Sequence, residues 1–401
     1  MTDRLLERRL RGLEAPDEGE AALRAWEVAA AEFERVERVP VPRRRPLQRR
    51  LAAAGAAAAL AALLISPAGA SVRHWVGERF ASPGVKHAQP ALVSLPSGGK
   101  LLVGSRDGTW IVSADGSKRL LGPYRDATWS PHGLFVAAVR GHSLVAVDPR
   151  GQVRWALPRL PAPRLPSWSP GDGFRVAYLS GSTLRVVAGD GNGDKLLARG
   201  VAAVAPAWRP GAAGRHVVSY WTNGGQIVTR DVDSGNLLWS ASATGSTPGS
   251  LQWSPRGHTL MVAGPRSLEL LDGRTGAVLK LLTTGSALRF ASADVSPDGR
   301  TIALARYDVP EDRSEVFLLR VGSRGWDARR SFAGAGRFDA VRWSPDGRWL
   351  LVTWRDADQW LFLRSAPARR LLAVSSIGRA FEPDRRGRPG FPAAGGWCCS
   401  P

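Results

Sequence analysis

The chain has few of the residues that build disulfide frameworks and metal sites. Its 401 residues include only two cysteines and six histidines, and five of its 55 lysine and arginine residues are lysine. The two cysteines, Cys398 and Cys399, are adjacent near the end of the sequence, so they cannot staple a fold or make a zinc site alone. An adjacent pair is strained as a bridge. We therefore expect either a free or intermolecular thiol at these positions, or an unstructured end in which they have no role.

Catalytic and metal-binding patterns are also missing. No Gly-x-Ser-x-Gly nucleophile turn and no His-Glu-x-x-His motif occurs. The segment Asp190–Asp194 places oxygen-bearing side chains at alternate positions, as a calcium loop does, but it lacks the downstream glutamate, which favours a hairpin turn. We expect no catalytic residue, no metal site and no cofactor. The pattern does not identify the binding residues.

A formal net charge of +20 raises the question of a nucleic-acid partner. The basic residues are spread through every repeat instead of clustering on one face, and their strong bias to arginine is typical of GC-rich coding. We therefore expect no specific nucleic acid. Anionic envelope polymers or lipid headgroups are the more natural partners of such a field.

What the sequence does contain is a turn of the form Trp-Ser-Pro-x-Gly that recurs about every forty residues. The copies, including a degenerate LPSGG, begin at positions 95, 129, 168, 208, 253, 295 and 343. They are separated by 34, 39, 40, 45, 42 and 48 residues. This period is typical of a propeller built from four-stranded blades.

Each repeat predicts four short strands. In the copy at Trp129, the turn SPHG is followed by the apolar runs LFVAAVR, LVAVD and VRWAL, with polar turns between them. Proline pre-sets the first turn, and glycine allows the positive φ that the return requires. No helical apolar period occurs between Ala91 and Ser376. We predict an all-β fold, a seven-bladed β-propeller of four-stranded blades over 91–380, in which the tryptophan ends the innermost strand and packs between blades.

The repeats resemble the WD-like propeller repeats of TolB-type proteins and of prolyl-oligopeptidase-type peptidases. Ser296–Gly299 and Ser344–Gly347 match their Ser-Pro-Asp-Gly turn fully, and Ser130-Pro131, Ser169-Pro170 and Ser254-Pro255 match it with the aspartate replaced or displaced. The resemblance covers about 285 residues and implies a recognition scaffold without naming its ligand.

The segment before the propeller differs in composition. Residues 1–50 predict a cytoplasmic region of short amphipathic helices that ends in a basic stretch, and residues 51–70 are uncharged and alanine-rich. Twenty residues at a rise of ~1.5 Å can cross a ~30 Å hydrocarbon core. We predict a transmembrane helix at 51–70. A cleaved signal peptide, with Ala68-Gly69-Ala70 as its cleavage site, and a soluble alanine-rich helix are the alternatives.

Basic residues set the predicted orientation. Five arginines lie within positions 43–50, and far fewer basic residues follow the span. The positive-inside rule then places the N-terminus in the cytoplasm and the propeller outside the membrane, after a juxtamembrane stalk at 71–90. The glycine- and proline-rich segment 381–401 predicts a disordered tail.

Together these features favour a single-pass membrane protein, not an enzyme, whose propeller binds a protein or an envelope polymer. A single-pass anti-sigma-like regulator with a propeller sensor is the main alternative, although residues 1–50 lack the histidine and cysteine cluster of many such regulators. An extracytoplasmic propeller enzyme is a third.

Overall fold

The computed structural model describes residues 94–171, 173–211, 215–243, 248–322, 325–364, 370–383, 387 and 389–399. The predicted cytoplasmic segment, transmembrane helix and stalk fall within residues 1–93 and lie outside this range. No helix in the described ranges is long and apolar enough to cross a membrane.

The described chain forms seven antiparallel sheets of four strands each, which confirms the predicted seven-bladed propeller. The first blade is β28 (Ala393–Cys398), β1 (Lys100–Ser105), β2 (Gly108–Ser113) and β3 (Lys118–Gly122). The second is β4 (Arg125–Trp129), β5 (Val136–Arg140), β6 (Ser143–Val147) and β7 (Val153–Pro158). The third is β8 (Pro163–Trp168), β9 (Arg175–Ser180), β10 (Thr183–Ala188) and β11 (Lys195–Arg199).

The remaining four blades follow the same order from the innermost strand outward. The fourth is β12 (Ala207–Trp208), β13 (Val217–Trp221), β14 (Gln226–Asp231) and β15 (Leu237–Ser242). The fifth is β16 (Ser250–Trp253), β17 (Thr259–Ala263), β18 (Ser267–Asp272) and β19 (Val278–Thr283). The sixth is β20 (Leu288–Val295), β21 (Thr301–Asp308), β22 (Arg313–Arg320) and β23 (Asp327–Ala335). The seventh is β24 (Phe338–Trp343), β25 (Trp349–Trp354), β26 (Gln359–Arg364) and β27 (Arg370–Ser375).

A serine closes the turn after the innermost strand. In the seventh blade, the amide of Trp349 donates to Ser344 Oγ at 2.9 Å, and Ser344 Oγ donates to Asp346 Oδ1 at 2.6 Å. Gly347 takes a φ of 67°, a left-handed conformation that favours glycine. The bond to the serine oxygen recurs at four more turns, those of Ser130, Ser169, Ser254 and Ser296. The repeated sequence motif is therefore a repeated hydrogen-bonded turn.

The tryptophan of the repeat lies between neighbouring blades, as predicted. Five innermost strands end in this tryptophan, and each of the five residues is at most 8% exposed: Trp129, Trp168, Trp208, Trp253 and Trp343. The indole nitrogen of Trp208 donates to Ser167 O of the preceding blade at 2.9 Å, and that of Trp343 donates to Asp294 O at 3.2 Å. The ring thus both buries apolar area and ties one blade to the next.

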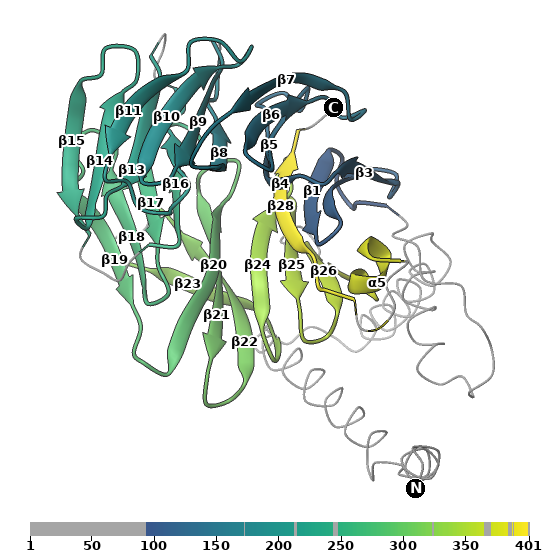
Figure 1. The fold of residues 1–401 in the computed structure, drawn as a ribbon. Helices are drawn as coiled ribbons and strands as arrows, with labels where there is room; N and C mark the ends of the chain where they lie inside the picture. The colour runs from purple at the N-terminus through teal and green to yellow at the C-terminus, as the bar shows by residue number, and fades with distance from the viewer. Residues whose placement is uncertain are drawn as a thin grey trace, which may run out of the picture. The chain divides into compact units, whose positions relative to one another are not determined.

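The ring is closed by the C-terminal segment, so the prediction of a disordered tail at 381–401 is wrong for residues 393–398. Strand β28 pairs with β1 and is the innermost strand of the first blade, where it contacts β24 on one side and β4 on the other. Figure 1 shows β28 in yellow beside the blue β1 and β4. Trp397 takes the place of the repeated tryptophan, and its indole nitrogen donates to Gly98 O at 3.2 Å. The propeller therefore extends past the predicted boundary at 380.

The chain reaches β28 through one short helix, α5 (Ile377–Phe381). Phe381 is 1% exposed and packs against Trp110 and Trp360, which anchors the connection to the first and seventh blades. The buried carboxylate of Glu382 accepts from the amides of Arg106 and Gly390. These contacts hold the segment that leads to the closing strand.

Cys398 and Cys399 are joined in a disulfide, so the expectation that they do not pair with each other is wrong in this structure. They lie at the end of β28, against the turn of the second blade. Their Sγ atoms are 3.8 Å from Ser130 O and 3.4 Å from Pro131 O, respectively.

Candidate functional site

In the second to seventh blades, two connections between strands lie at one end of the propeller. Because the strands within a blade are antiparallel, the turn after the innermost strand and the turn between the third and fourth strands lie at the same end. We call this end the turn face. Its loops differ in sequence from blade to blade, and loops held by a rigid scaffold are the usual place for binding residues.

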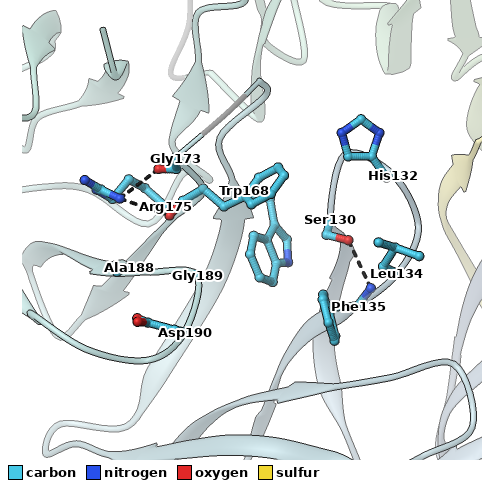
Figure 2. Close-up of a pocket in the computed structure, with 11 residues that line it drawn as sticks. Ser130, His132, Leu134, Phe135, Trp168, Gly173, Arg175, Ala188, Gly189 and Asp190 are labelled. Atoms are coloured by element: carbon cyan, nitrogen blue, oxygen red, sulfur yellow. Dashed lines mark hydrogen bonds between the residues drawn. The ribbon is translucent and has the colours of Figure 1, made fainter. Parts of the chain in front are cut away.

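A pocket opens on the turn face between the second and third blades, with a volume of about 290 Å³. We call it the blade 2–3 pocket, and Figure 2 shows the side chains around it. The second blade lines it with Ser130, His132, Leu134 and Phe135, and the third blade lines it with Trp168, Gly173, Phe174, Arg175, Ala188, Gly189 and Asp190. Most of these side chains are apolar or aromatic, as in ligand pockets generally.

Two apolar side chains at the rim are exposed to solvent. Leu134 is 61% exposed and Phe174 is 36% exposed. In each turn, the amide that donates to the serine Oγ belongs to the next residue, Phe135 or Arg175. Leu134 and Phe174 therefore occupy equivalent positions in neighbouring blades. The same position in the fifth, sixth and seventh blades holds an exposed histidine or arginine, namely His258, Arg300 and Arg348. The fold therefore does not require an apolar residue there.

Trp168 forms a wall of the pocket. Its ring is 8% exposed, and its indole nitrogen is buried without a hydrogen-bond partner among the described residues. Figure 2 shows this nitrogen on the side of the ring that faces Ser130. The equivalent Trp253 also lacks a partner, whereas Trp129 donates to Gly396 O at 3.1 Å. Of the repeated tryptophans, Trp168 and Trp253 thus have an indole nitrogen without a hydrogen-bond partner among the described residues, and Trp168 is the one that lines the blade 2–3 pocket.

The charged groups at the rim are largely tied to their own loops. Hydrogen bonds from the amide and side chain of Asn192 hold the pKa of the Asp190 carboxyl below its usual range. Arg175 Nη1 donates to the carbonyl oxygens of Gly173 and Phe174 at 2.7 and 3.2 Å, and Arg175 Nη2 lies 3.8 Å from Asp233. The pocket lining therefore carries one carboxylate and one guanidinium, and Asp233 contacts that guanidinium from outside the lining.

A histidine–aspartate pair lies beside the pocket. His216 Nδ1 is 2.7 Å from Asp233 Oδ2, and the imidazole packs edge-on against Trp208 with ring centroids 6.3 Å apart. Arg175 links this pair to the pocket rim through its contact with Asp233. Sequence reasoning missed this pairing because the two residues belong to different turns of the fourth blade.

A second polar cluster joins the innermost strands of the fifth, sixth and seventh blades. Asp294 accepts from Gln252 Nε2 at 2.8 Å and from the Trp343 amide at 2.7 Å. Gln252 Oε1 in turn accepts from the Val295 amide at 3.1 Å. Burial raises the pKa of the Asp294 carboxyl, while nearby Arg342 and these hydrogen bonds act in the opposite direction. Both oxygens of the carboxylate are engaged, so we assign the cluster to joining the blades.

Further polar residues lie in turns between strands. His132 and His258 are both exposed, and His132 also lines the blade 2–3 pocket. Asp194 contacts Arg159, Arg185 and Tyr178, so the segment Asp190–Asp194 is a hairpin turn with its second carboxylate already engaged. No group of three metal-ligating side chains occurs in the part of the chain that the structure describes.

Comparisons with known proteins identify the fold. No protein-family model matches the chain, and no curated protein matches it. Hsv2 from Kluyveromyces lactis is 12% identical, with a TM-score of 0.52 over 68% of this chain and 94% of that protein. The propeller domain of Cps50 (Swd1) from Myceliophteria thermophila is 13% identical, with a TM-score of 0.50 over 72% of this chain and all of that domain (100%). At these identities the similarity shows a WD40-like seven-bladed propeller and nothing finer.

Proposed function

We propose that the protein is a membrane-anchored binding scaffold whose extracytoplasmic propeller holds a protein partner and has no catalytic centre. The observation that carries this proposal is the turn face, where an otherwise regular ring bears an apolar pocket between two blades. Propellers of this kind commonly bind proteins, because their loops vary while the blades keep the ring rigid.

The proposed location rests on the sequence. The uncharged segment 51–70 follows a basic stretch, which supports a single span with the N-terminus in the cytoplasm. The resemblance of the repeats to TolB-type propellers agrees with a position in the cell envelope. A propeller sensor of an anti-sigma-like regulator would have the same topology, and binding would be its task as well.

Three measurements test the proposal. Protease added to intact cells should digest the propeller and spare an N-terminal fragment of residues 1–45. The purified full chain in detergent should retain a specific envelope protein after chemical cross-linking in cells, and it should not turn over a panel of glycan, ester and peptide substrates. Turnover of any panel substrate, abolished by replacing an Asp, Glu or His of the propeller, would show that the protein is an enzyme.

A further inference from the structure

The blade 2–3 pocket has an unusual rim. The position held by Arg300 and Arg348 in the sixth and seventh blades is held by Leu134 and Phe174 on the two sides of this pocket. Exposed leucine and phenylalanine side chains lose favourable apolar burial unless something covers them. Because the same turn forms with arginine, the turn itself does not require an apolar residue; Phe174 packs edge-on against His132 across the blade boundary, with ring centroids 5.9 Å apart, whereas Leu134 stays 61% exposed.

The size of the pocket limits its occupant. A volume of about 290 Å³ is at the lower end of the ~300–1,000 Å³ typical of small-molecule pockets. It suits a single large side chain better than a nucleotide or a sugar chain. The ring of Trp168 offers such a side chain a flat apolar wall.

The charge at the rim indicates what lies next to that side chain. Asp190 and Asp233 supply two carboxylates, and Arg175 supplies the guanidinium, which already donates to two backbone carbonyls. The pKa of Asp190 is lowered, so its carboxylate is ionised at neutral pH. Because Arg175 is engaged by two backbone carbonyls and by Asp233, the Asp190 carboxylate is the charged group of the lining that would attract a basic neighbour on the occupant.

We propose that the blade 2–3 pocket binds a peptide segment of the partner protein that inserts one large apolar side chain beside Trp168 and places a lysine or arginine opposite Asp190. This inference rests on the proposed binding function and names the site and the partner's chemistry. In the complex, Leu134 and Phe174 cover the inserted side chain.

The test uses the purified full chain in detergent and three fluorescent hexapeptides, Ala-Ala-Phe-Lys-Ala-Ala and versions in which Phe is replaced by Ala or Lys by Asp. The Phe-Lys peptide should bind at least about tenfold more tightly than either control in a polarisation assay. The indole N–H resonance of Trp168, assigned from its loss in Trp168→Phe, should shift during the titration. Absence of binding at up to about 1 mM peptide would overturn the proposal.

Matched variants locate the site. Leu134→Arg and Phe174→Arg introduce the residue found at the same position in other blades, so they should fold, and each should weaken the Phe-Lys peptide about tenfold. Asp190→Asn should abolish the preference for Lys over Asp while the preference for Phe remains. Leu237→Arg, which changes a 53% exposed leucine on the outer strand of the fourth blade, is the control and should bind normally.

Two outcomes separate this inference from the proposed function. If the partner cross-linked in cells is retained equally by wild type, Leu134→Arg and Phe174→Arg, the pocket is not its docking site, although the scaffold function stands. If wild type retains no partner and turns over a substrate, the scaffold function itself fails.

Discussion

The substitution Asp294→Ala tests how three blades are held together. It removes the acceptor of the buried Trp343 amide, which costs about 1–3 kcal/mol, and one acceptor of Gln252, which costs about 1 kcal/mol. Removing a carboxyl whose burial raises its pKa offsets part of this loss. We expect a net decrease of about 2–3 kcal/mol in the free energy of unfolding. Urea denaturation of the full chain in detergent, followed by tryptophan fluorescence, measures it.

The isosteric change Asp294→Asn should cost less, about 1 kcal/mol, because the amide oxygen still accepts from Trp343. To accept from the new amide nitrogen, Gln252 must turn its own oxygen away from Val295, which loses one bond. Asp107→Ala, at an exposed turn residue of the first blade, is the control and should change stability by less than about 0.5 kcal/mol. If Asp294→Ala were no more destabilising than Asp107→Ala, the blade-joining role would be refuted.

The pH dependence gives an independent check on Asp294. Its pKa is raised in the folded chain, so the folded state binds this proton more tightly than the unfolded state does. Protonated Asp294 therefore contributes its full stabilisation below the pKa that the residue has in the unfolded chain. This stabilisation is lost as the pH rises through the higher pKa of the folded chain. Asparagine does not titrate, so the stability difference between wild type and Asp294→Asn should shrink between pH 4 and pH 7. A difference that grows over this range would contradict the raised pKa.

Three further predictions concern the repeat and its closure. Trp397→Ala should lower the free energy of unfolding by about 3–5 kcal/mol, since the ring is 8% exposed in the closing strand, whereas alanine at the 80% exposed Leu160 should have almost no effect in the same denaturation assay. Ser344→Ala should cost about 1–2 kcal/mol because the Trp349 amide loses its acceptor, and equal stability by thermal unfolding would show that the serine bond is dispensable. Acid should destabilise the chain as the pH falls below about 4, because hydrogen bonds lower the pKa of turn carboxylates in the folded state. Their stabilisation is fully present above the unfolded pKa and is lost as the pH falls through the folded pKa. A melting temperature that is constant from pH 7 to pH 3 would contradict this account of the carboxylates concerned, which include Asp115, Asp148, Asp190 and Asp272.

The local features of the fold could be predicted because each is encoded in a few adjacent residues. The residues of each turn and the apolar strand that follows it are neighbours in sequence, so seven copies predicted the number of blades. Asp294 illustrates what could not be predicted, because its partners Gln252 and Trp343 lie 42 and 49 positions away. Such contacts depend on how the blades are placed around the ring, which the repeat pattern does not specify.

The closing strand was missed because its composition is that of a loop. The segment AAGGWC contains two glycines and no β-branched residue, although it pairs along β1. A side chain at Gly395 would come within 3.2 Å of Leu102 Cβ and its carbonyl oxygen, so close packing favours glycine there. The signal that could have identified the strand is Trp397 itself, because the first repeat lacks the tryptophan that ends an innermost strand.

The blade 2–3 pocket could also have been found by aligning the repeats. Leu134 and Phe174 are visible as apolar residues where the other turns have His258, Arg300 or Arg348, but their meeting across a blade boundary appears only in the ring. The repeat motif is shared by these turns, and the pocket is distinguished by the residues in which its two turns differ from the others.

The closing strand and the pocket share one structural support. The disulfide-bonded Cys398 and Cys399 lie against Ser130 and Pro131, and a side chain at Gly133 would come within 3.1 Å of Cys399 Sγ. The other side of this same turn lines the blade 2–3 pocket through Ser130, His132 and Leu134. Cys398 and Cys399 thus pack against the turn of the second blade that forms one wall of the pocket. The closing strand, which lacks the usual strand composition, therefore packs against the same turn that lines the blade 2–3 pocket.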